Sequence, residues 1–268
     1  MSDLWRADFA ASPPFHHVAD LAARLASRDW PRLDRLDAIA RERGLSNAAG
    51  LPVSFAAQHV RCGQRDYEAG ILASGRVPSR ERNWHDLLNA LTWLAFPRAK
   101  AALNAVQCSA LPPRQGDPRG GQRGARSDAA TLFDESGLLL VAETDAMAGL
   151  LAARRWQEAF IQRRAAWTAV RAYAFGHALL QKLMGPWPGI TAKCLFLRAD
   201  RLPDPGLPPA WLDTALAEVC RNDSGDGRMH RPADLFPVPL LGIPGWWPGN
   251  GDPAFYLDAS VFRPLRIG

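Results

Sequence analysis

The clearest pattern of apolar and polar positions in the chain lies between residues 82 and 104. At about 100° per residue, the large apolar side chains of this segment gather within about 80° of one direction, and they are Trp84, Leu87, Leu88, Leu91, Leu94 and Ala95. Trp93 points to the opposite side, where a helix at a protein surface carries charged residues. The pattern therefore predicts a helix that other parts of the fold cover on both sides.

The polar residues of this helix allow two interpretations. Asn83 is suited to cap the helix N-terminus, and Asp86 would favour the positive end of the helix dipole, so both have a structural role. His85 and Asn89 share a flank next to the apolar face, and polar groups on a covered helix need partners. They are either satisfied by neighbouring structure or they line a ligand site.

Hydrophobic periodicity elsewhere predicts further helices, at residues 17–28, 32–43, 65–73, 97–107, 145–165 and 176–184, of which 145–165 is basic. Apolar runs predict buried strands at 138–142, 170–175 and 190–199. Residues 51–56 are predicted to be irregular, and Asp134–Gly137 to form a polar turn. Many helices with two to four short strands indicate a mainly helical α+β fold, and the length of 268 residues suits a single domain over residues 1–268.

Two segments lack such periodicity. Residues 110–125 are rich in Pro, Gly and Arg, which predicts a mobile surface loop. Residues 222–268 are predicted to be irregular, and their uncharged stretch 235–251 holds four prolines and four glycines, which exclude a helix that spans a membrane. This stretch is better interpreted as a buried strap, anchored by Trp246 and Trp247.

Charge and cysteine content narrow the class of protein. A net charge of +5 on 268 residues does not demand a nucleic-acid partner, and we do not favour one, although the arginines of residues 114–126 and 154–164 permit it. The four cysteines are widely separated and form no zinc-finger pattern. The N-terminus has no basic segment followed by an apolar one, which indicates a soluble protein of the cytoplasm rather than a secreted one.

Several motifs occur in an order that resembles a bacterial family catalogued as domain of unknown function 3025. They are YEAGILASGRVPSRERNWHDLLNALTWLAFPRAKAALNA, RSDAATLFDESG, FGHALLQKL and PWPGITAK, followed by VFRP near the C-terminus. The resemblance implies a bacterial protein whose motif positions include Asn83, His85, Asp86, Asn89, Lys100, Arg126, Asp134, Glu135 and His177. Gln181 stands where the family carries an acidic residue, so a metal site at this motif would lack that carboxylate.

Three hypotheses of function remain open. In the first, the protein is hydrolase-like, with His85, His177, Asp134 and Glu135 as catalytic residues and Asn89, Lys100 and Arg126 binding a small-molecule or phosphate-containing ligand. One version resembles an HD-type phosphohydrolase, in which His59, His85, Asp86 and Asp134 or Asp145 hold a metal.

In the second hypothesis, the protein is a binding module that uses its arginine-rich surface for an anionic ligand or nucleic acid. In the third, it is a non-catalytic structural or partner protein whose buried polar groups are satisfied by backbone. The sequence identifies no cofactor, metal or partner. The three hypotheses differ in the distances that they predict between His85, His177, Asp134 and Glu135.

Overall fold

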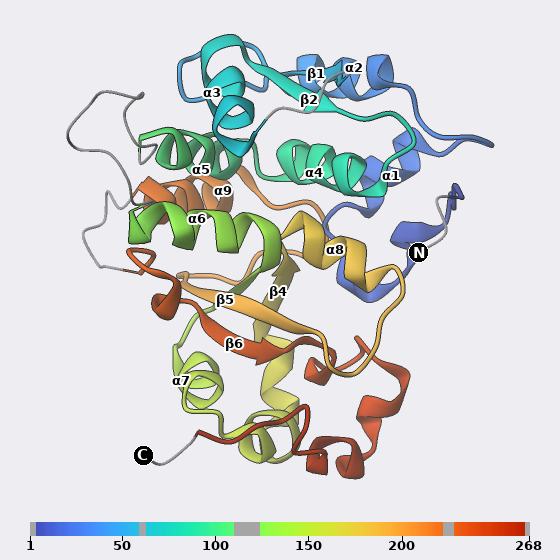
Figure 1. Ribbon diagram of the computed structural model, residues 1–268. Coiled ribbons are helices and arrows are strands. Elements are labelled where there is room, and N and C mark those ends of the chain that lie inside the picture. Colours follow the sequence, from blue (N-terminus) through green and yellow to red (C-terminus); the bar gives the residue numbers. More distant parts are fainter. Residues whose placement is uncertain (1–3, 59–62, 110–123, 222–227, 266–268) are drawn as a thin grey trace.

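A layer of helices lies between two sheets in the computed structural model, which describes residues 4–58, 63–109, 124–221 and 228–265 (Figure 1). The helices are α1 (Ala19–Leu25), α2 (Leu33–Glu42), α3 (Gln64–Ser74), α4 (Trp84–Ala95), α5 (Pro97–Ser109), α6 (Ala125–Ser136), α7 (Ala146–Ala152), α8 (His177–Leu183) and α9 (Ala210–Arg221). The strands are β1 (Ser54–Ala57), β2 (Arg76–Ser79), β3 (Gly137–Ala142), β4 (Val170–Ala174), β5 (Thr191–Arg198) and β6 (Phe236–Pro239). The predicted α+β class is confirmed.

The two sheets differ in size and in strand direction. Strands β1 and β2 pair in parallel and form the small sheet. The larger sheet has the order β4-β3-β5-β6, in which the central pair β3 and β5 is parallel and both outer pairs are antiparallel. Every residue of β3 is buried, as expected for a central strand that is covered on both faces.

Helix α4 is covered on both sides, as its sequence predicts. It packs against α5, α8 and α1, and also against β2 of the small sheet. Trp93 is only 2% exposed, and the indole ring of Trp84 stacks on that of Trp5 with ring centroids 5.2 Å apart. Asn83 caps the helix by accepting a hydrogen bond from the backbone N–H of Asp86 at 3.1 Å.

The end of α6 and the start of α8 meet at one edge of the large sheet. Helix α6 runs directly into β3, and β4, which pairs with β3, leads within three residues into α8. The backbone N–H groups of Phe175 and Gly176 both donate to the carbonyl oxygen of Gly137 at 2.9 Å. The predicted polar turn at residues 134–137 is therefore wrong. Asp134 and Glu135 lie in the last turn of α6, because the apolar side chains of Ala129, Ala130 and Phe133 extend the buried face of that helix to its end.

The predicted basic helix at residues 145–165 is also wrong. Helix α7 ends at Ala152, because Arg154 adopts a left-handed conformation with φ of 53°. The N–H of Arg155 then bonds back to the carbonyl of Leu150, which closes the helix end. The chain continues as a π-helical turn at Glu158–Gln162 and a 3-10 helix at Arg164–Ala169.

Strands β1, β2 and β6 and helix α9 were not predicted from the sequence. Strand β1 lies where an irregular stretch was expected, and its partner β2 and helix α9 had no prediction. Strand β6 lies within the predicted strap and holds two prolines, which its position at the sheet edge tolerates. Trp246 and Trp247 of this strap are each partly buried.

The predicted loop at residues 110–125 falls almost entirely on residues 110–123, which lie outside the described residues. Among the helices that the structure describes, none combines the length and apolar character needed to cross a membrane.

Candidate functional site

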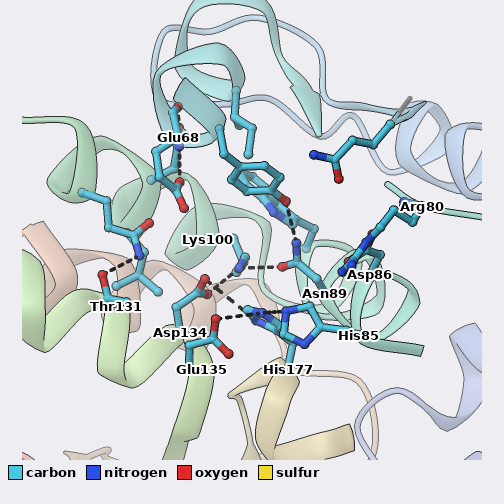
Figure 2. Close-up of a pocket in the computed structure, with 17 residues that line it drawn as sticks. Glu68, Arg80, His85, Asp86, Asn89, Lys100, Thr131, Asp134, Glu135 and His177 are labelled. Atoms are coloured by element: carbon cyan, nitrogen blue, oxygen red, sulfur yellow. Dashed lines mark hydrogen bonds and ion pairs between the residues drawn. The ribbon is translucent and has the colours of Figure 1, made fainter. Parts of the chain in front are cut away.

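A cavity of about 410 Å³ lies among α3, α4, α5, α6 and α8, and polar side chains dominate its wall (Figure 2). All four residues predicted as catalytic line it, namely His85, Asp134, Glu135 and His177. Asn89 and Lys100, predicted to bind ligand, line it as well. The volume lies in the range of pockets that bind small molecules.

Two imidazole rings meet at one side of the cavity. The Nε2 atoms of His85 on α4 and His177 on α8 lie 3.0 Å apart, and the rings form a T-shaped pair. Glu135, from the last turn of α6, places its carboxylate Oε1 at 3.5 Å from Nε2 of His177. Figure 2 shows these three side chains converging from separate elements.

The opposite nitrogen of each ring faces an acceptor. Nδ1 of His85 lies 3.2 Å from the amide oxygen Oε1 of Gln181, so it carries the proton and donates it. Nδ1 of His177 has no hydrogen-bond partner, and the carboxylate oxygen Oδ2 of Asp134 lies 3.9 Å from it. With its proton on Nε2, His177 donates to Nε2 of His85 and lies next to the Glu135 carboxylate. With its proton on Nδ1 instead, the two Nε2 lone pairs would face each other, an arrangement that a cation between them stabilises.

His85, Glu135 and His177 have the geometry of a metal-binding group. One ligand atom from each residue lies within 4.8 Å of the others. Two nitrogens that bind the same tetrahedral zinc ion lie about 3.3 Å apart, given Zn–N bonds of about 2.0–2.1 Å. The separation of 3.0 Å between the two Nε2 atoms would need to widen by only a few tenths of an ångström.

The charge states of these groups also suit metal binding. Burial opposes ionisation of Glu135, but the hydrogen bond with His177 and nearby positive charge outweigh it and lower the pKa of Glu135 to about 2. Burial lowers the pKa of His85, and the neighbouring His177 lowers it further. At neutral pH the site therefore offers a carboxylate and a neutral His85 imidazole, the forms that bind metals.

A buried lysine lies next to this group. Nζ of Lys100, on α5, forms an ion pair with Asp134 and donates to Oδ1 of Asn89 at 2.8 Å. The amide nitrogen of Asn89 in turn donates to the hydroxyl oxygen of Tyr67 at 3.1 Å. Lys100 is only 4% exposed, so its charge depends on these partners.

A second polar group forms the opposite end of the cavity. Glu68, on α3, is buried, and its carboxylate accepts a hydrogen bond from Nδ2 of Asn104 at 2.8 Å. Burial raises the pKa of Glu68 to about 7, and the charge of Asp134 acts in the same direction.

Asp86 and Arg126 have other roles in the structure. The Asp86 carboxylate accepts hydrogen bonds from the backbone N–H of Arg80 at 2.6 Å and from its guanidinium at 2.8 Å. Arg126 donates to the backbone carbonyls of Cys220 and Arg221 at the end of α9, away from the cavity wall.

Of the residues in the HD-type arrangement, His85, Asp86 and Asp134 line the cavity, where the Asp86 carboxylate is bonded to Arg80. His59 lies outside the described residues. Asp145 precedes α7, on the other face of the large sheet from the cavity (Figure 1).

Sequence reasoning did not single out seven of the described polar residues of the wall, namely Gln58, Tyr67, Glu68, Arg80, Asn104, Gln107 and Thr131. A signal was present in α5, because Lys100, Asn104 and Gln107 follow at spacings of four and three and so share one face of an alanine-rich helix. For Tyr67 and Glu68 no comparable pattern exists, since the residues that precede them in α3 are polar as well.

Comparison with known families gives one match. The model of the family described as protein of unknown function (DUF3025) matches residues 53–266, and the chain belongs to this family. No curated protein and no solved structure matches the chain. The matched residues include every side chain of the cavity described above.

Proposed function

We propose that this member of the DUF3025 family is a metal-dependent hydrolase of small molecules, in which His85, Glu135 and His177 hold a divalent cation. The observation that carries this proposal is the approach of the two Nε2 atoms to 3.0 Å, with acceptors facing the Nδ1 atoms on the far side of each ring. An acceptor behind a histidine is the usual partner of a metal-binding imidazole. Two histidines and one glutamate also form a donor set that catalytic zinc sites use.

The charge of the wall supports a bound cation. Four carboxylates line the cavity, namely Glu68, Asp86, Asp134 and Glu135, against the two cations Arg80 and Lys100. With neutral imidazoles, ionisation of all four carboxylates leaves two negative charges without a partner. A divalent cation would balance them.

Three protein ligands leave one position of a tetrahedral ion open for water. A divalent cation held by His85, Glu135 and His177 would lower the pKa of a bound water to about 7 and so supply a nucleophile at neutral pH. The water oxygen would bond to a carbonyl carbon or a phosphorus atom of the substrate as the bond to the leaving group breaks, and the proton that the water loses would end on the leaving group. The cavity volume of about 410 Å³ suits a small molecule rather than a polymer.

The other two hypotheses have less support. A structural protein would satisfy its buried polar groups through backbone, whereas Lys100, Asp134, Asn89 and His85 bind other side chains of the cavity. Three arginines of residues 154–164, which a nucleic-acid surface would use, are engaged within the chain: Arg155 and Arg163 pair with Glu158, and Arg164 donates to Tyr256.

Metal analysis of the purified protein tests the proposal. After incubation with zinc and removal of the excess, we expect one zinc per chain, and none in His85→Ala or His177→Ala. His230→Ala is the matched control, because His230 is exposed and remote from the cavity, so it should retain zinc. Equal zinc content in the wild type and in both cavity variants would refute a metal site at these residues.

Activity is the second measurement. We expect the zinc-loaded protein to hydrolyse p-nitrophenyl acetate or bis-p-nitrophenyl phosphate, and the activity to disappear on chelation and return with zinc. Activity that persists after chelation would show that the reaction does not need the metal. The two histidines would then share a proton instead.

A further inference from the structure

A carboxylate and two amide side chains, from Glu68, Asn104 and Gln107, line the end of the cavity formed by α3 and α5. The carboxylate of Glu68 accepts a hydrogen bond from Nδ2 of Asn104. When the amide nitrogen of Gln107 faces Glu68, it donates to both carboxylate oxygens, at 3.1 and 3.2 Å. Figure 2 shows Glu68 well apart from the His85 and His177 pair. This end is therefore separate from the proposed metal site, within the same cavity.

One acceptor at this end has no partner. Oδ1 of Asn104 is buried without a hydrogen bond, while Nδ2 of the same amide donates to the carboxylate and to the backbone carbonyl of Glu68. These two bonds fix the orientation of the amide, so Oδ1 cannot exchange places with the nitrogen. A buried acceptor without a donor is costly, so a donor that a ligand brings to this end of the cavity would stabilise it.

Glu68 also lacks a cation. Among the side chains that the structure describes, no lysine or arginine forms an ion pair with its carboxylate. Asn104 and Gln107 stabilise the carboxylate with neutral hydrogen bonds, yet burial still raises its pKa to about 7. A positively charged ligand at this end would stabilise the ionised carboxylate, whereas an anionic ligand would be repelled.

We propose that Glu68 and Asn104 bind a cationic nitrogen of the substrate, an ammonium or a guanidinium group. An ammonium group offers three donors and a guanidinium five, enough to reach the carboxylate and Oδ1 of Asn104 together. This inference rests on the proposed function and names its substrate class: a small molecule with a cationic nitrogen at one end and an acyl or phosphoryl bond at the other.

Calorimetric titration of the zinc-loaded full chain tests the inference. The probes are n-butylammonium and n-butylguanidinium, with n-butanol as the neutral analogue of similar length. We expect one of the two cations to bind at least about tenfold more tightly than butanol, and Glu68→Gln to abolish that preference, since it removes the charge-assisted hydrogen bond. The stronger of the two cations identifies the group that the site prefers.

Glu143→Gln is the matched control, because Glu143 is exposed and its side chain lies outside the cavity. Its cation binding should equal that of the wild type. Should Glu68→Gln fail to fold by circular dichroism, Asn104→Ala decides the question, because loss of the unpartnered acceptor should weaken cation binding at least about threefold. Equal binding of butanol and both cations by the wild type, or cation binding unchanged in the folded cavity variant, would overturn the inference.

Zinc content of the same samples separates the two proposals. One zinc per chain without preference for a cation would overturn the substrate class and leave the metal site standing. Preference for a cation in a protein that binds no zinc would overturn the metal site and leave the cation-binding role of Glu68 standing.

Discussion

The α-carbon of Gly176 lies against the backbone of Glu135, so that a Cβ atom at residue 176 would approach the carbonyl oxygen of Glu135 to 2.4 Å. The same atom would lie 2.5 Å from the backbone nitrogen of Gly137. Because His177 follows Gly176 directly, this contact sets the distance between two of the three proposed metal ligands. Only glycine permits the approach.

Gly176→Ala should therefore weaken zinc binding at least about tenfold and lower the melting temperature, since the new methyl group meets backbone that cannot yield without moving α6 from α8. Zinc titration and thermal unfolding measure the two effects. Gly149→Ala is the control, because a Cβ there meets nothing within 4 Å. That helical position should gain up to about 1 kcal/mol of stability. Unchanged zinc affinity in Gly176→Ala would contradict the role of the contact.

Gln181→Glu should raise zinc affinity about tenfold or more. A carboxylate that accepts from Nδ1 of His85 makes its Nε2 a stronger ligand than the present amide oxygen does. Gln181→Leu removes the acceptor and should lower the affinity by a similar factor. Competition with a chromogenic chelator gives the zinc affinities, which we expect to be highest for Gln181→Glu, intermediate for the wild type and lowest for Gln181→Leu. Any other order would exclude Gln181 as the residue that orients His85.

Lys100→Met should destabilise the fold by about 3–5 kcal/mol, because it leaves the charge of Asp134 buried without its ion-pair partner. The double variant Lys100→Met with Asp134→Asn removes both charges and should recover part of that loss. Urea unfolding of the metal-free proteins gives the free energies. A double variant that is less stable than Lys100→Met alone would mean that Asp134 does not depend on Lys100.

His17 should make stability depend on pH. Burial lowers its pKa from 6.5 to about 3, with the charge of His16 acting in the same direction. The unfolded chain therefore takes up a proton near pH 6.5 that the folded chain refuses, so stability is complete above that pH and falls as the pH decreases toward 3. Between pH 6 and 4 the wild type should lose about 2.5 kcal/mol more than His17→Phe. Parallel losses in the two proteins would show that His17 does not titrate differently in the folded state.

The affinity for a cation at Glu68 should also depend on pH, because the Glu68 carboxyl must be ionised to bind it. Its pKa of about 7 means that the carboxylate is present above pH 7 and protonated below it. Affinity of the zinc-loaded protein for the preferred cation should be constant above pH 7 and fall about tenfold per unit below it. Asp134, Lys100 and His177 are titratable groups that act on Glu68, and they stay in place in Glu68→Gln. That variant should show no such change near pH 7.

The sequence predicted the position of α4 and the composition of the site better than its geometry. Apolar periodicity located α4, and the residues singled out in it and in α8 do meet, at His85 and His177. The pattern did not reveal that Asp134 and Glu135 end a helix, because the polar run that follows Phe133 is equally typical of a turn. Burial of Phe133 in the core, which the sequence does not show, favours the helix over the turn. The place of Glu68 in the cavity could not be predicted from the sequence, because its burial results from packing of α3 on α5, two segments that are separate in the chain.

His85 and His177 are 92 positions apart in the chain, and Glu135 comes from between them. An unfolded chain cannot gather these three side chains without first closing loops of about 40–50 residues, which is entropically unfavourable. The ion would thus bind the finished fold far more tightly than any intermediate, and would stabilise it by mass action. Metal supply in the surroundings would in this way set how long the folded protein survives, in addition to whether it is active.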